Sequence, residues 1–286
     1  MHFFWSHVNA RAFRQRVWAD VILCALICTP ARPQAEPNAG PSLTSDPQAI
    51  SLAQKSIAAL LRGVTISDVT LNANVISLLG SDYETGTGTL RAKGTSKSRV
   101  DLNLDKGSLL ELRTDSNGVP SGAWGRNGKS RKSFAQHNCW TDAAWFFPAL
   151  SSLSQTANPH FVFKYIGPQT RNGVPVQHIV VFQSRPDDGG LLQRLSTMDF
   201  YLDASSSLPL DIAFNLHADD NMNLNLPTEI RFANYKSISG TTIPLHFQKL
   251  INGNVILDIS VTSAVVNSGV SDNLFTNAMA VQEGTL

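Results

Sequence analysis

The sequence predicts a mainly β protein built on an open, strongly curved antiparallel sheet, a half-barrel. In the last third of the chain, apolar and polar residues alternate with a period of two, as in residues 198–203 and 210–215. This is the pattern of strands with one buried face. Short turns such as Ser239-Gly240 and Asn252-Gly253 join the runs, and turns this short require antiparallel neighbours. About ten to thirteen such runs make a sheet too wide to stay flat.

The N-terminus has the features of an export signal. Three arginines within residues 11–16 precede the apolar run 21–28, and small residues follow it. The apolar stretch is about twelve residues long even when counted from Val17, short of the roughly 20 that span a bilayer. We therefore expect residues 1–35 to be a signal peptide that is removed on export to the periplasm or the outer envelope. The alternative is the start of a buried helix.

Charge and cysteine usage exclude several classes of protein. Removing residues 1–35 takes away four of the 23 Lys and Arg residues and one of the 22 Asp and Glu residues, which leaves a net charge near −2. That charge gives no footprint for nucleic acid or an anionic membrane surface. Cys28 follows Leu26-Ile27 instead of a small residue, so we do not expect it to be lipidated. Only Cys139 then remains, which rules out an intramolecular disulfide.

An amphipathic helix precedes the first strand. Residues 36–45 form a Pro/Gly/Ser-rich leader. Asp46 is a natural N-cap, Pro47 stands at the first helical position, and Gly63 ends the helix, which predicts a helix over Pro47–Leu61. Its apolar stripe must pack on an apolar surface. The stripe consists of Ile50, Ala53, Ile57, Leu60 and Leu61.

Strand signals follow the helix through the rest of a single domain, residues 46–275, with residues 276–286 as a C-terminal tail. Residues 191–195 are expected to form a helical turn. The predicted strands are 69–78, 85–93, 98–104, 109–114, 121–124, 129–135, 161–166, 176–182, 198–203, 210–215, 229–235, 242–251 and 255–265.

The central segment 140–153 breaks the strand pattern and is unusually apolar. It predicts two short helices separated at Pro148. Two interpretations of its large side chains stay open. They are plain core, or they form the lid of an apolar cavity, in which an acyl chain is held at about 0.8 kcal/mol per methylene.

Candidate catalytic and metal-binding groups are weak. His137 and Cys139 could form a base and a nucleophile, but residues two apart often point away from each other. A lone cysteine is more often a small core residue. The acidic and histidine residues within 217–220 and at 187–188 lie in polar loops, where carboxylates usually face water. We expect no catalytic residue, no metal site and no cofactor.

The C-terminal motifs resemble the LolA/LolB-like lipoprotein-carrier superfamily. Residues 201–210 resemble a strand–turn–strand motif of that superfamily, in which an aspartate is followed by small turn residues and Leu-Pro. Residues 232–244 resemble its hairpin, in which a strand with Tyr is followed by Gly and Ile-Pro. Residues 266–267 with 272–275 resemble its closing strand and exit. The chain from residue 36 onward, including residues 139–148, is also similar to a group of uncharacterised exported bacterial proteins. The resemblance implies a curved antiparallel half-barrel with an apolar concavity, lidded by the N-terminal helix and the central insertion.

The function expected from this resemblance is non-catalytic binding of a lipid or a lipoprotein acyl chain by a monomer in the cell envelope. The first alternative is an envelope module that binds another protein through its sheet, and the second is an uncharacterised hydrolase. A large apolar pocket would favour lipid binding. A filled core with an exposed apolar patch would favour the protein-binding module. Converging polar groups with perturbed pKa values would favour an enzyme. The predicted ligand-binding residues are Ile57, Leu60, Trp140, Trp145, Phe146, Phe147 and Leu150.

Overall fold

The computed structural model describes residues 43–79, 83–129, 131–186 and 188–276. The predicted signal peptide, most of the leader and nearly all of the C-terminal tail lie outside the described residues. From Leu43 onward the described residues form one compact unit. Neither α-helix in that part of the chain has the length and apolar character of a membrane-spanning helix.

Helix α1 (Pro47–Leu61) has the predicted bounds. Pro47 opens it, and Arg62 closes it in the left-handed region (φ 49°), its backbone N–H donating to Ala58 O. Asp46 stands at the N-cap position, but its side chain does not cap the helix. Its carboxylate instead accepts from the backbone N–H of Tyr165 at 3.0 Å, and its own N–H donates to Phe163 O at 2.8 Å. The start of α1 is thereby fastened to an edge strand of the sheet.

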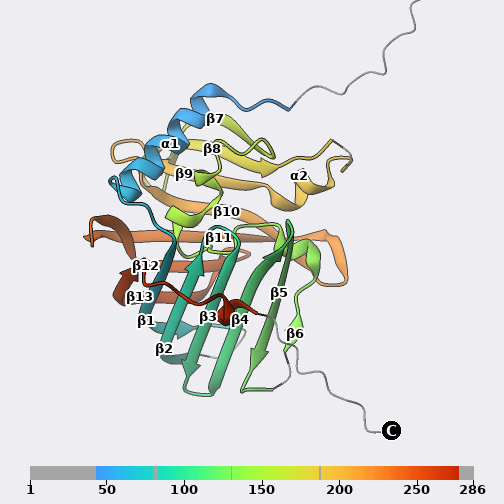
Figure 1. Ribbon diagram of the computed structural model, residues 1–286, viewed down its shortest axis with the longest axis vertical. Coiled ribbons are helices and arrows are strands. Elements are labelled where there is room, and N and C mark those ends of the chain that lie inside the picture. The colour runs from blue at the N-terminus through green and yellow to red at the C-terminus, as the bar shows by residue number, and fades with distance from the viewer. Residues whose placement is uncertain (1–42, 80–82, 130, 187, 277–286) are drawn as a thin grey trace, which may run out of the picture. The chain divides into compact units, whose positions relative to one another are not determined.

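The described residues contain thirteen strands in a single antiparallel sheet, and its two edge strands do not pair with each other. The order is β6-β5-β4-β3-β2-β1-β13-β12-β11-β10-β9-β8-β7, so the first and last strands along the chain meet in the middle. This confirms the predicted open half-barrel (Figure 1). The strands are β1 (Asp68–Ser77), β2 (Glu84–Lys93), β3 (Lys97–Leu104), β4 (Gly107–Ser116), β5 (Val119–Arg126), β6 (Lys132–Ser133), β7 (Phe161–Arg171), β8 (Val174–Gln183), β9 (Met198–Asp203), β10 (Pro209–Ala218), β11 (Asn221–Ile238), β12 (Thr241–Ile251) and β13 (Asn254–Val266).

Three strands differ from the prediction by five or more residues in length, and one of them is β7, which runs to Arg171 instead of ending at residue 166. Strand β11 begins at Asn221, eight residues before the predicted start at residue 229, and β6 is only two residues long. Residues 221–226 alternate Asn with Met or Leu, so the period-two signal was present and the prediction missed it; in the structure these residues are mostly exposed. Their pairing with β10, such as Leu216 opposite Leu226, makes them a strand.

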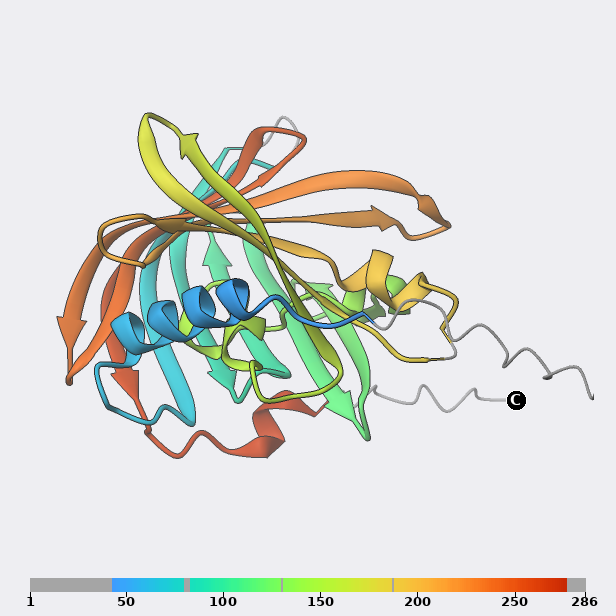
Figure 2. The same ribbon diagram turned by 90° about the horizontal axis from the view of Figure 1, so that it is seen from above.

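The central insertion is helical only in single 3-10 turns: η1 (Gln136–Cys139), η2 (Pro148–Leu150) and η3 (Ser152–Ser154). Pro148 therefore starts a 3-10 turn, and the first of the two predicted short helices is absent, because residues 140–147 contain only bends and turns. Helix α2 (Leu191–Ser196) confirms the predicted helical turn. Seen from above, α1 and the insertion lie inside the curve of the sheet (Figure 2).

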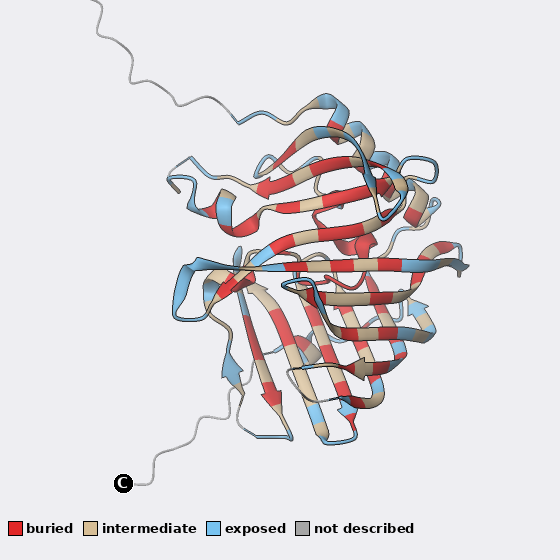
Figure 3. Cartoon of the chain, turned by 180° about the vertical axis from the view of Figure 1, so that it is seen from behind, coloured by how far each residue is buried: buried red, intermediate tan, exposed pale blue. Residues whose placement is uncertain are grey.

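The two faces of the sheet have different partners. Buried residues recur in bands across the strands (Figure 3), and the main core lies on the concave side, against α1 and the central insertion. On the convex side, Leu112 packs with Val270 and Phe275, the latter from the 3-10 turn η4 (Asp272–Phe275). The large apolar face available for function is therefore the covered concave one.

Candidate functional site: the covered concavity of the sheet

The floor of the concavity is built from the inward-facing positions of the central strands. Phe232 of β11 pairs with Phe247 of β12, which pairs in turn with Ile259 of β13. All three side chains are buried. Alternate residues of a strand face the same side of the sheet, and in each of these strands the alternate positions that include these residues are mostly apolar. The period-two pattern therefore places the three side chains on this face.

Residues 140–158, called the plug below, fill the concavity above this floor. Phe146 is fully buried, and its ring stacks on that of Phe247 with centroids 6.5 Å apart. Trp145 meets Phe146 edge to face at 5.5 Å and Phe247 at 6.1 Å. Such offset and edge-on pairs are the favourable aromatic geometries. The plug therefore fills the concave side of the sheet.

The structure brings most of the predicted ligand-binding residues together, in one buried core. Leu60 of α1 and Leu150 of the plug are 1% and 5% exposed and belong to the same cluster as the aromatic rings. Ile57 packs at the edge of that cluster and lines a shallow hollow of about 370 Å³ beside α1. Trp140 lies apart, with the Arg185 guanidinium 5.7 Å from its ring centroid. The core members are Leu60, Trp145, Phe146, Phe147 and Leu150.

The plug is held to the rest of the protein mainly by apolar packing. From residue 146 to residue 157, every hydrogen bond of the described chain has its partner within residues 142–158. The hydrogen bonds to strand residues lie at the two ends of the plug. At its start Arg113 donates to Thr141 O and Trp145 Nε1 donates to Glu111, and at its end the Phe161 N–H donates to Asn158 O. A segment attached in this way can be displaced without breaking a strand ladder.

Asp142 links the start of the plug to Ser152, ten residues further along the plug. Its carboxylate accepts from the backbone N–H of Ser152 at 3.0 Å and from the Ser152 hydroxyl at 3.2 Å. The side chain is half-buried, and desolvation raises its pKa to about 6, against the lowering effects of Ser152 and of the Arg113 charge. The carboxylate that fastens the plug therefore titrates close to neutral pH.

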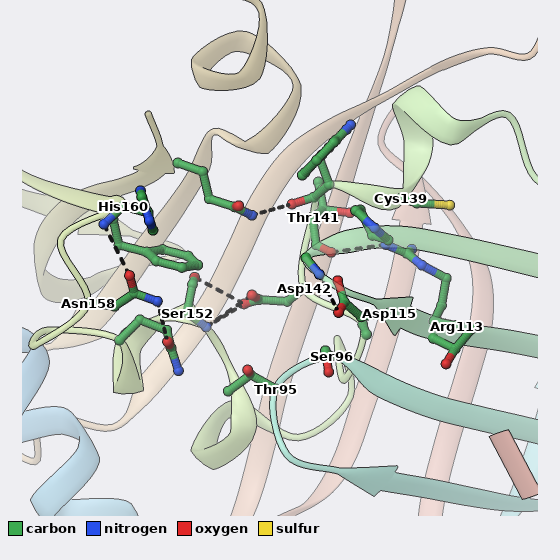
Figure 4. A pocket seen from close by; sticks show the side chains of 18 of the residues that line it. Thr95, Ser96, Arg113, Asp115, Cys139, Thr141, Asp142, Ser152, Asn158 and His160 are labelled. Carbon is green, nitrogen blue, oxygen red and sulfur yellow. Dashed lines mark hydrogen bonds between the residues drawn. The ribbon is translucent and has the colours of Figure 1, made fainter. Parts of the chain in front are cut away.

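A polar hollow of about 280 Å³ opens beside Asp142 (Figure 4). Its lining includes Arg113, Cys139, Asp142 and His160, a set of residue types that could suggest catalysis. The geometry does not assemble a nucleophile and a base. Cys139 Sγ points away from Asp142 (Figure 4) and donates to Ala135 O at 3.8 Å, while the His137 ring bonds Ala218 O at 3.0 Å.

Replacing Cys139 is expected to leave ligand binding intact. Burial is the main cause that raises the pKa of the thiol, the opposite of what a reactive cysteine needs. Cys139→Ala should cost about 1–2 kcal/mol of unfolding free energy, measured by urea denaturation. A turnover activity that disappeared in a folded Cys139→Ala protein would establish a thiol enzyme instead.

A second hollow of about 340 Å³ lies on the concave side, and the prediction missed it. It is lined by charged residues from the floor together with aromatic and aliphatic side chains. One signal was readable in the sequence, since Lys249 follows Ile243 and Phe247 on the apolar parity of β12. Glu111 and Arg113 carried no such signal, because both parities of residues 109–113 are partly apolar. The lining residues used below are Glu111, Arg113, Trp124, Phe134, His217, Leu216, Leu226 and Lys249.

Among the described residues, no group of three or more His, Cys, Asp or Glu side chains is arranged to hold a metal ion. Within residues 217–220, His217 is buried and Asp219 is exposed, and both line the concave hollow. Asp187 lies outside the described residues.

Comparisons with known proteins identify the fold. A scan of protein-family models and a search of curated proteins gave no match. Among solved structures, a domain named for outer membrane lipoprotein sorting from Vibrio parahaemolyticus is similar, with a TM-score of 0.53 and 14% identity over 80% of this chain and 96% of that one. A DUF1329 family protein from Desulfovibrio piger has a TM-score of 0.52 and 10% identity over the same shares.

A LolA superfamily protein from Nitrosomonas europaea also matches, at a TM-score of 0.48 and 10% identity over 80% of this chain and 97% of that one. At 10–14% identity these comparisons show similarity of fold alone. Together with the open thirteen-stranded sheet of the described residues, the first two matches show that the chain shares the fold of the Vibrio parahaemolyticus and Desulfovibrio piger proteins.

Proposed function

We propose that this protein is a non-catalytic, exported binding protein that holds the acyl chain of a lipid or lipoprotein on the concave face of its sheet. The observation that carries the proposal is the plug, whose residues 146–157 fill an apolar concavity without a hydrogen bond to the sheet or to α1. An acyl chain can replace such contacts with contacts of the same kind. The predicted export signal supports an envelope location, where acylated cargo occurs.

The energetics of exchange support this proposal. Each methylene removed from water contributes about 0.8 kcal/mol, so a chain of about twelve carbons gains an amount comparable to the burial of several plug side chains. Because the plug has no strand ladder to break, its displacement costs mainly apolar contacts, which the ligand restores. The lipoprotein-sorting name of the Vibrio parahaemolyticus domain, which has the same fold, agrees with an acyl ligand.

A second candidate function is binding of an envelope protein. The concavity is filled, and the overhanging start of β11 exposes Met222 by 39% and Leu224 by 53%. Exposed apolar residues on a strand that extends beyond the sheet could pair with a partner's strand. In this case the plug would stay in place when the partner binds.

The two functions differ in what Trp145 does. Replacing Trp124 and Trp140 by Phe leaves Trp145 as the only tryptophan after residue 35. Titration with dodecanoate should shift Trp145 emission as the ring leaves its buried site, whereas a variant that keeps only Trp140 should change little. Native mass spectrometry of protein from the periplasm should find a co-purified lipid. An unchanged Trp145 emission at saturating dodecanoate and a lipid-free protein would overturn the acyl-binding function.

A further inference from the structure

Arg113 is a buried cation without an anionic partner. It projects from β4 into the concavity and is 6% exposed, and its Nη2 donates to Thr141 O at 3.0 Å. In the described part of the chain, no carboxylate oxygen forms an ion pair with it within 4.0 Å. This guanidinium therefore lacks a counter-ion among the described residues. Because an unpaired buried charge is costly, a bound anion would stabilise it.

The nearby carboxylates are committed elsewhere. Glu111 accepts from Trp145 Nε1 at 3.1 Å and lies 3.8 Å from Lys249 Nζ. Asp142 is bound to Ser152, and its pKa of about 6 shows that the Arg113 charge does not overcome its desolvation. Asp219 also lines the hollow, but it is exposed and accepts from Asn138 Nδ2 at 3.4 Å. The hollow therefore holds two carboxylates and two cations, and Arg113 is the cation that no carboxylate of the described residues reaches within ion-pair distance.

His217 adds a second unsatisfied group to the same hollow. Its side chain is 2% exposed, and neither ring nitrogen makes a hydrogen bond of ordinary geometry. Burial is the first cause that lowers its pKa, while Asn225 on the paired strand acts in the opposite direction. A neutral imidazole offers one N–H donor. Buried polar groups normally have partners, so the ring is available to a ligand.

The remaining walls of the hollow are apolar and lead toward the plug. Trp124, Leu216 and Leu226 line it beside the charged groups. Lys249 Nζ lies 4.6 Å from the centroid of the Trp145 ring, so the cationic site adjoins the base of the plug. A free inorganic anion would contact only the charged groups of the hollow, whereas an amphiphile would contact the charged groups with its head and the apolar walls with its chain.

We propose that this hollow is a headgroup site, in which Arg113, Lys249 and His217 bind the oxyanion, carboxylate or phosphate, at the end of an acyl chain. The inference rests on the proposed acyl-binding function and adds the class of headgroup. Arg113 supplies the planar pair of N–H donors that matches an oxyanion. Lys249 adds charge, and the His217 ring adds a donor. The acyl chain then extends along Trp124 toward the space of the plug.

Isothermal titration calorimetry at pH 7.5 tests the site with three probes: dodecanoate, the neutral amphiphile monolaurin and acetate. The parent protein should bind dodecanoate at least tenfold more tightly than monolaurin, and acetate should not bind measurably. Arg113→Gln and Lys249→Gln should each weaken dodecanoate at least tenfold and leave monolaurin unchanged. Arg113→Lys should restore part of the loss, because it keeps the charge.

Arg91→Gln is the matched control, since Arg91 is paired with Asp101 at 3.0 Å, away from the hollow, and should not affect dodecanoate. Equal affinity for dodecanoate and monolaurin, unchanged by Arg113→Gln and Lys249→Gln, would overturn the headgroup site while keeping acyl binding. Acetate binding as tightly as dodecanoate would reduce the site to a small-anion site and also overturn it. If neither amphiphile binds the parent, the acyl-binding function itself fails.

Discussion

Phe146→Ala is expected to lower the free energy of unfolding by about 3–5 kcal/mol. Phe146 is fully buried at the centre of the concavity, stacked on Phe247 and edge-on to Trp145, so its truncation leaves a space that the surrounding rings cannot fill. For a domain of this size, the melting temperature should fall by roughly 10 °C. Differential scanning calorimetry and urea denaturation measure the loss.

Tyr83→Ala is the control for aromatic truncation, because Tyr83 is 60% exposed and its loss should change stability by less than about 0.5 kcal/mol. The same pair of variants tests whether the plug competes with ligand. Phe146→Ala should bind dodecanoate at least as tightly as the parent, since the ring no longer has to be displaced. Several-fold weaker binding in a folded Phe146→Ala protein would show that Phe146 is a permanent wall of the site.

Asp142→Asn is expected to stabilise the protein at pH 7.5 by about 1–2 kcal/mol. The pKa of Asp142 is raised from 3.8 to about 6, and 1.36 kcal/mol per pKa unit makes the ionised carboxylate cost at most about 3 kcal/mol. Solvent in the adjoining hollow reduces this figure, and the amide replaces one of the two oxygens that accept from Ser152. Urea denaturation at pH 7.5 measures the difference.

The sign of the pH dependence follows from the raised pKa. Below 3.8 the carboxyl is protonated in both states and costs nothing, and its cost appears as the pH rises through about 6. Acidification from pH 7.5 to pH 5 should therefore raise the free energy of unfolding of the parent by about 1 kcal/mol through this group. The Asp142→Asn protein should lack this increase.

Comparing the two proteins at each pH removes the contribution of other groups. His217, whose pKa is lowered by burial, acts in the opposite direction on acidification but is present in both. Asp115→Asn, which changes another acid that lines the same hollow, should keep the parental pH profile. A parental profile in Asp142→Asn would mean that the plug is not fastened by a titrating carboxylate.

The sequence by itself determined the architecture, because it depends on local and repetitive signals. The bounds of α1 follow from Pro47 at its start and from the left-handed Arg62 before Gly63. The strands follow from a period of two, and the turns at Ser239 and Asn252 show the expected positive φ angles of 49° and 51°. Each signal is readable within a few residues, so about ten to thirteen strands and their antiparallel pairing were predictable, and the described residues contain thirteen.

The tertiary structure alone decided what fills the concavity and which of its groups lack partners. The apolar composition of residues 140–153 fits a lid or a core equally well, and only packing against Phe247 and Leu60 distinguishes them. Arg113 and His217 carry no sequence signal of their isolation, because a missing partner is a property of distance. Lys249 could be placed on the apolar face from its parity, but its position above the Trp145 ring depends on contacts between residues about a hundred positions apart.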